Sequence, residues 1–164
     1  MQTQTLRGFT LVELMITISV LAVLLAIAVP SFSEIVLSSR LRSYANDFVA
    51  STTLARGEAI KRNSLVSLCA SSNGTSCTGN WEQGWIVLAG TTVIQRQQAL
   101  HPGMKMAESG GAVSINFQST GVGSTPVTLT VCRSVPSPGS QERVISVSAT
   151  GRASVTKTTT GNCP

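Results

Sequence analysis

The amino-terminal part of the chain contains one long apolar stretch. From Phe9 to Val29 there are 21 residues, nearly all apolar, and Glu13 carries the only charge among them. A helix needs about 20 such residues to cross a hydrocarbon core about 30 Å thick. The pattern therefore predicts a transmembrane helix over residues 9–29, preceded by a short polar segment of residues 1–8.

After Pro30 the pattern becomes amphipathic. Apolar side chains recur three, four or seven residues apart, as on one face of a helix: Leu37, Leu41, Tyr44, Phe48, Ala55 and Ala59. Polar residues fall mostly on the other faces. The helix is predicted to continue to about residue 62. A kink or local break is expected at Pro30, because proline cannot donate a hydrogen bond to the carbonyl of Ala26.

Beyond residue 63 the pattern changes to short runs that alternate or are rich in β-branched residues. Strands are predicted at about 65–70, 85–89, 92–99, 113–117, 127–132, 143–148 and 153–156. Gly, Pro, Asn and Ser separate these runs and indicate turns, a spacing that suits antiparallel hairpins. The predicted fold class is α+β, in which the long amino-terminal helix packs its apolar stripe on one antiparallel β-sheet.

Length and composition bound the number of domains. The chain has 164 residues, a formal net charge of +5, 12% charged residues and 4% aromatic residues. About 135 residues follow Pro30, which suits one globular domain on a membrane stalk. The predicted head is therefore residues 30–164, made of the amphipathic helix to about 62 and a β-rich region over 64–164.

All four cysteines lie in this head, which predicts disulfide bonds if the head is exported. Three connectivities are possible. We favour Cys69–Cys77, which closes a short loop around Asn73-Gly74, and Cys132–Cys163, which ties the last residues back to a strand. A zinc site is the alternative. No Cys-x-x-Cys occurs and His101 is the only histidine, so no metal or cofactor is predicted, and no catalytic constellation emerges.

The run Gly8-Phe9-Thr10-Leu11-Val12-Glu13-Leu14, joined to the apolar stretch, resembles the type IV prepilin class of pilins, minor pilins and pseudopilins. The resemblance implies that prepilin peptidase cuts between Gly8 and Phe9, that residues 1–8 are a leader, and that the new amino-terminal Phe9 is N-methylated. It also implies that Glu13 sets the register of assembly, by pairing with the amino group of Phe9 on a neighbouring subunit. The alternative is that Glu13 only complements the helix dipole near the membrane surface.

Several later segments narrow the resemblance to the GspH/FimT branch of minor pilins and pseudopilins. They are Leu54–Asn63 with Val66–Cys69, Trp81 with Gly84–Val87, Ile115–Phe117 with Gly121, and Ser148–Arg152. Membership implies the pilin fold and a subunit of a thin filament. The expected partners are prepilin peptidase and other major and minor pilins. The expected location is the inner membrane with a periplasmic head, and then a pilus or pseudopilus.

The leading hypothesis is a non-enzymatic minor type IV pilin that takes part in pilus assembly or a tip complex. The first alternative is a minor pseudopilin of a type II secretion system. The second is a DNA receptor in natural transformation, with Arg143, Arg152 and Lys157 as candidate contacts, since cationic side chains bind phosphate backbones. The receptor tails of FimT-like proteins resemble Gly-Arg-x-Arg, and this chain has Gly151-Arg152-Ala153-Ser154, without the second arginine. The tryptophans Trp81 and Trp85 are candidates for an interface or, at least for Trp85, for the core.

Overall fold

The computed structural model describes residues 9–123 and 126–163. One helix, α1 (Leu11–Arg62), runs for 52 residues and belongs to two compact units, residues 1–36 and residues 37–164. In the first unit the described residues are almost all exposed and helical from Leu11. Helical structure continues without interruption through Pro30, so the predicted local break is absent there. A kink at Pro30 stays a prediction.

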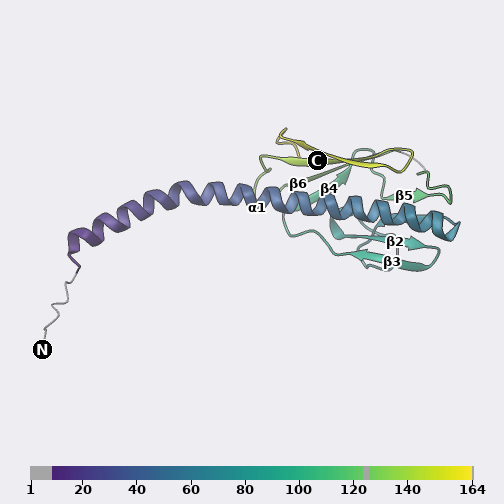
Figure 1. The fold of residues 1–164 in the computed structure, drawn as a ribbon, viewed down its shortest axis with the longest axis horizontal. Coiled ribbons are helices and arrows are strands. Elements are labelled where there is room, and N and C mark those ends of the chain that lie inside the picture. Colours follow the sequence, from purple (N-terminus) through teal and green to yellow (C-terminus); the bar gives the residue numbers. More distant parts are fainter. Residues whose placement is uncertain (1–8, 124–125, 164) are drawn as a thin grey trace, which may run out of the picture. The chain divides into compact units, whose positions relative to one another are not determined.

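The second unit contains the rest of α1, a short 3₁₀ helix η1 (Trp81–Gln83) and eight strands. The strands are β1 (Val66–Ala70), β2 (Trp85–Ala89), β3 (Thr92–Gln97), β4 (Met104–Glu108), β5 (Ser114–Phe117), β6 (Val127–Arg133), β7 (Glu142–Val147) and β8 (Ala153–Thr158). They form two antiparallel four-stranded sheets. The first sheet has the order β3-β2-β1-β5 and the second sheet has the order β4-β6-β7-β8 (Figure 1).

The α+β fold class is confirmed, and two details differ from prediction. The strands make two sheets where one was expected, because β4 and β6 pair with each other and not with the strands before them. Strand β4 was also missed. Its sequence, Met-Lys-Met-Ala-Glu, has no β-branched or aromatic residue, although Met104 and Met106 alternate inward as a strand requires.

The predicted stripe of α1 forms the centre of the core. Leu37, Leu41, Phe48, Ala55 and Ala59 are all buried, and they belong to one hydrophobic cluster with side chains of both sheets. Tyr44, on the same stripe, is partly buried. Its hydroxyl oxygen accepts a hydrogen bond from the backbone N–H of His101 at 3.0 Å. The helix therefore holds the two sheets together by presenting one apolar face to both.

Both tryptophans belong to this core, so an interface role for Trp81 or Trp85 is wrong. Their rings pack edge-on against Phe48, each with a centroid separation of 5.4 Å. Their polar atoms are satisfied inside the protein. The indole N–H of Trp85 donates to Ser51 Oγ at 2.9 Å, and that of Trp81 donates to the carbonyl of Ala112 at 2.7 Å. Buried Ser51 of α1 thus provides the hydrogen-bond acceptor that the buried indole of Trp85 in β2 requires.

Two disulfides join the pairs favoured from the sequence. Cys69, in β1, is bonded to Cys77, and Cys132, in β6, is bonded to Cys163 near the carboxyl end. In the first loop Asn73 Oδ1 accepts hydrogen bonds from the backbone N–H groups of Thr75 and Ser76, which forms the predicted turn. The second disulfide fixes the carboxyl-terminal segment against the second sheet.

Candidate functional site

The amino end of α1 carries a capping box formed by Thr10 and Glu13. Oε2 of Glu13 accepts hydrogen bonds from the backbone N–H of Thr10 at 3.0 Å and from its hydroxyl at 2.9 Å. The Thr10 hydroxyl oxygen in turn accepts the backbone N–H of Glu13 at 3.2 Å. The helix begins here because the two side chains satisfy backbone donors that have no partner within the helix.

The second oxygen of Glu13, Oε1, has no hydrogen bond among the described residues. One carboxylate oxygen therefore caps the helix while the other is open to a further donor. The predicted partner of Glu13, the amino group of Phe9, exists only after cleavage before Phe9. Gly8, the other side of the predicted cleavage site, lies outside the described residues, and Phe9 is exposed.

The apolar side chains that follow are not covered by any other part of the chain that the structure describes. Over residues 11–29 every large apolar side chain is at least half exposed. Of the helices in the described part, α1 is long and apolar enough to cross a membrane, by length and composition. Exposed apolar surface on this scale marks a segment that is buried by lipid or by other chains.

A charged cluster lies at the other end of α1. Glu58 pairs with Lys61 at 3.6 Å and with Arg62 at 2.6 Å, one helical turn further on. Positive side chains at the carboxyl end of a helix also favour its dipole. Arg56, two residues before Glu58, lies against Gly121 and Gly151, where an added Cβ would come within 3.3 Å of its side chain. These contacts account for the cluster as a structural feature at the carboxyl end of α1.

The three candidate DNA contacts are not equivalent in the structure. Arg152 and Lys157 are exposed, but Arg143 is only 5% exposed. Its guanidinium donates to Gln141 Oε1 at 3.2 Å, to the carbonyl of Glu142 at 3.0 Å and to Ser38 Oγ at 3.1 Å. Burial, and then the positive charge of Arg42, lower its pKa. The prediction of Arg143 as a DNA contact is wrong, because this arginine joins β7 to α1.

Glu142, the neighbour of Arg143, is buried on the opposite face of β7 and holds the carboxyl-terminal segment. Its Oε2 accepts hydrogen bonds from Thr158 Oγ1 at 2.8 Å and from the Thr160 N–H at 3.1 Å, and Oε1 accepts the Gly161 N–H at 2.7 Å. Burial raises the pKa of this carboxyl, but these hydrogen bonds outweigh burial and hold the pKa below its ordinary 4.5. Nothing in the local sequence distinguished this residue from a surface glutamate.

Replacing Glu142 with glutamine should destabilise the head near neutral pH. The glutamine amino group would face donors, so about 1–3 kcal/mol of unfolding free energy should be lost. Because the folded pKa is lowered, the stabilisation by Glu142 is present above the unfolded pKa and is lost as pH falls through the folded one. We therefore expect the difference between wild type and Glu142→Gln to shrink below about pH 4.5, measured by urea unfolding at several pH values. A constant difference would contradict this.

Glu108 plays the same role at the loop that joins the two sheets. Its carboxylate accepts backbone N–H groups from Gly110 at 2.7 Å, Ala112 at 2.8 Å and Thr128 at 3.3 Å. Burial raises its pKa, but the hydrogen bonds prevail and hold the pKa below 4.5. In the Ser-Gly-Gly turn that follows, the Gly110 N–H bonds to the Glu108 carboxylate, whereas the N–H groups of Ser109 and Gly111 bond to backbone carbonyls. A glycine-rich turn directly after a glutamate is the sequence signal that could have indicated this role.

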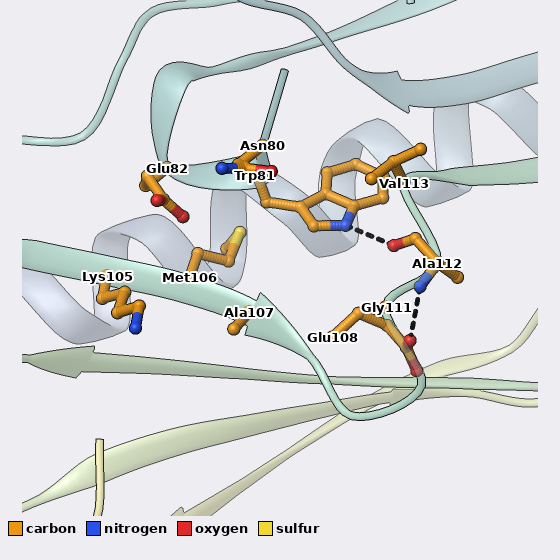
Figure 2. Close-up of a pocket in the computed structure, with 10 residues that line it drawn as sticks. All are labelled: Asn80, Trp81, Glu82, Lys105, Met106, Ala107, Glu108, Gly111, Ala112 and Val113. Carbon is orange, nitrogen blue, oxygen red and sulfur yellow. Dashed lines mark hydrogen bonds between the residues drawn. The ribbon is translucent and has the colours of Figure 1, made fainter. Parts of the chain in front are cut away.

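A cavity of about 220 Å³ lies beside Glu108, between η1, β4 and the residues before β5. Figure 2 shows the indole of Trp81 reaching Ala112 across it, and Ala112 bonded in turn to Glu108. Glu82 and Lys105 also line the cavity, and no ion pair joins these two described residues to each other. Its lining contains no Ser, Thr or Cys, so it presents no side-chain hydroxyl or thiol nucleophile.

His101 directly precedes a turn at Pro102-Gly103, between β3 and β4. Its carbonyl accepts the N–H of Met104 at 3.0 Å, and its ring Nδ1 lies 2.9 Å from the Pro102 carbonyl. Within the described residues no three His, Cys, Asp or Glu side chains gather in a way that could hold a metal ion. The functional features of the described chain are thus the capped apolar helix and a braced head.

Comparison with known proteins gives two family matches. A model described as "Type II transport protein GspH" matches residues 44–151. A second model, the prokaryotic N-terminal methylation motif, matches residues 6–29. The first match begins within the amphipathic part of α1 and covers most of the head, and the second covers the predicted cleavage site and the apolar segment.

Similar individual proteins agree with these matches. Prepilin peptidase-dependent protein D of Escherichia coli (strain K12) is 29% identical over 97 residues, which are 58% of this chain and 66% of that protein. The chain thus spans slightly less than two thirds of this relative. The type IV minor pilin FimU of Pseudomonas aeruginosa has a similar fold, with a TM-score of 0.59 and 20% identity over 73% of this chain and 90% of FimU. The minor pseudopilin EpsH of Vibrio cholerae also has a similar fold, with a TM-score of 0.53 and 15% identity over 71% of this chain and 96% of EpsH.

Proposed function

Because the chain belongs to the GspH family, we propose that it is a minor pilin of a type IV pilus that takes part in assembly or in a tip complex. The observation that carries the proposal is the exposed apolar segment over residues 11–29, which lies within the match to the methylation motif and continues into a pilin-like head. Lipid covers this segment before assembly, with the head in the periplasm. Other pilins cover it afterwards.

Assembly buries apolar helix surface among subunits, and the attraction comes from close van der Waals packing of the helices, because the lipid that they leave is as apolar as their side chains. This attraction does not by itself fix the axial position of one helix relative to its neighbour. Glu13 supplies the register. Its Oε2 stays bonded to Thr10, and its open Oε1 accepts the amino group of Phe9 from the neighbouring subunit. A carboxylate without this partner in an apolar bundle is strongly disfavoured, so registers that leave it unpaired are rejected.

Mass spectrometry of the chain from native filaments tests the processing step. We expect the mature product to begin at Phe9, with a methylated amino group, and to have lost one positive charge with Arg7, from +5 to +4. A control in a strain without prepilin peptidase should give the full chain. A filament subunit that retains residues 1–8, or that lacks the apolar segment, would contradict the proposal.

The first alternative is a minor pseudopilin of a type II secretion system. It uses the same helix and head, and is supported by the name of the family model and by the fold shared with EpsH. A deletion strain distinguishes the two machines. Loss of twitching motility with normal exoprotein release supports the pilus, and the reverse result supports the secretion system.

The second alternative, a DNA receptor, now depends on Arg152 and Lys157, which are exposed and have no ion pair among the described residues. For electrostatic binding of this kind the logarithm of the binding constant falls linearly with the logarithm of the salt concentration. The slope is set by the number of phosphates that the protein contacts. If the head is a receptor, neutralising both residues should flatten that slope in a duplex DNA titration, whereas Arg143→Gln should act only through stability. Absence of binding at low salt would reject this alternative.

A further inference from the structure

A second cavity, of about 240 Å³, lies beside the loop closed by the Cys69–Cys77 disulfide. Its walls are that loop, the end of η1 and the end of β3 with the residues that follow it. Its lining consists of Ser71, Ser72, Asn73, Gly74, Gln83, Arg96, Gln97, Gln98 and Ala99. Apart from Gly74 and Ala99, every lining residue has a polar side chain, so this cavity differs in kind from the core.

Arg96 is the one charged residue of this lining, and no Asp or Glu belongs to it. Its side chain lies directly over Gly74, where an added Cβ would be 2.6 Å from Nε. Gly74 also has a φ of +70°, which side chains other than glycine rarely adopt. The glycine therefore both shapes the turn and leaves the space that the guanidinium occupies. Arg96 is exposed at the open side of this cavity, and no residue of the lining carries a counter-charge.

The loop that faces Arg96 is held in one conformation. Ser71 Oγ accepts the Gly74 N–H at 2.9 Å and donates to the Ser76 carbonyl at 2.7 Å. Asn73 Nδ2 donates to Ser76 Oγ at 2.8 Å. With the disulfide, these bonds fix the wall before any ligand arrives. Such preorganisation reduces the entropy lost on binding.

The polar groups around Arg96 define the ligand chemistry. A guanidinium matches a carboxylate by two parallel hydrogen bonds. The amides of Gln97 and Gln98 can each donate and accept, as hydroxyl groups require. Gln83 Oε1 already accepts the Asn80 N–H at 3.0 Å, so its amino group is the part left for a ligand. We propose that this cavity binds a carboxylate-bearing sugar of the hexuronic acid class, as a free sugar or as a unit of an acidic polysaccharide.

The test uses the full chain in detergent micelles and measures binding by calorimetry. The probes are D-galacturonate and its trimer, with D-galactose, inorganic phosphate and N-acetylglutamate as comparisons. We expect both galacturonates to bind more tightly than all three comparisons. Arg96→Gln should weaken galacturonate binding about tenfold or more, and Arg96→Lys should weaken it less, because lysine keeps the charge but loses the two-bond geometry. Arg40→Gln, at an exposed arginine of α1, is the matched control and should bind as wild type does.

Tighter binding of the trimer identifies a polysaccharide as the source, and equal binding identifies the single sugar. Four results would overturn the proposal. Phosphate binding as tightly as galacturonate would mean general attraction of anions. N-acetylglutamate binding equally well would mean that the cavity receives an acidic side chain of a protein. Absence of galacturonate binding, or equal weakening by Arg40→Gln, would mean that no sugar site exists here.

Discussion

Replacing Glu13 with alanine should remove the chain from sheared filaments, by more than about tenfold relative to its cellular level. The reason is loss of the carboxylate that pairs with the amino group of Phe9 on the next subunit. Without this pair the apolar helices have no favoured register. The head should stay folded, because the buried core begins at Leu37. Immunoblots of sheared filaments and of whole cells measure incorporation, and far-ultraviolet circular dichroism measures folding.

The variant Thr10→Val separates the two roles of Glu13. It removes the hydroxyl that bonds to Glu13 while the carboxylate stays in place. An N-cap residue contributes about 1 kcal/mol, which is small for a helix of 52 residues. We therefore expect Thr10→Val to be incorporated nearly as wild type. Equal loss of Thr10→Val and Glu13→Ala would mean that Glu13 acts by capping alone. Normal incorporation of Glu13→Ala would exclude the register mechanism.

The variant Phe48→Ala should have the largest effect on the stability of the head. The Phe48 ring is fully buried and packs against both tryptophans, so it connects α1 to η1 and β2. A large-to-small change at such a site costs about 3–5 kcal/mol, through lost burial and the cavity left behind. Since whole domains are stable by about 5–15 kcal/mol, this is a large part of the total.

Urea unfolding followed by circular dichroism, with both disulfides intact, measures this effect. Leu65→Ala is the matched control, because Leu65 is 55% exposed and its truncation should cost well under 1 kcal/mol. A loss for Phe48→Ala no larger than that for Leu65→Ala would mean that the helix does not depend on this contact. Tryptophan fluorescence is unsuitable as the only probe, because Phe48 touches both indoles.

Elements whose signal is local were predicted well. The stripe of α1 was read from helical spacing, and nearly all its residues are buried. Seven of the eight strands were found near their observed bounds, because β-branched residues and intervening turns are visible in the sequence. The disulfide pairs followed from a turn inside the first loop and from the position of Cys163 near the chain end. Strand β4 was missed because its methionines carry no such preference.

The charged residues of the head were predicted poorly. Arg143 and Glu142 are adjacent in a strand, and in sequence they resemble an exposed charged pair. The structure buries both, since α1 covers one face of β7 and the carboxyl-terminal segment covers the other. Trp81 was a candidate for an interface because the segments that bury it are likewise distant in the sequence. Its cover comes from Phe48 and Ala112, which are 33 and 31 residues away in the sequence.

The sequence by itself determined the apolar helix, its charged residue, the amphipathic continuation and the β-rich head. Each of these depends on residues near one another in the chain, where periodicity and turn chemistry act. Only the tertiary structure decided the division of the strands into two sheets, the burial of Arg143 and Glu142, and the cavity beside Arg96. These features depend on which distant segments of the chain pack against each other. That packing sets the free energy of a buried charge, because the hydrogen bonds that the charge loses with water must be replaced by hydrogen bonds within the protein.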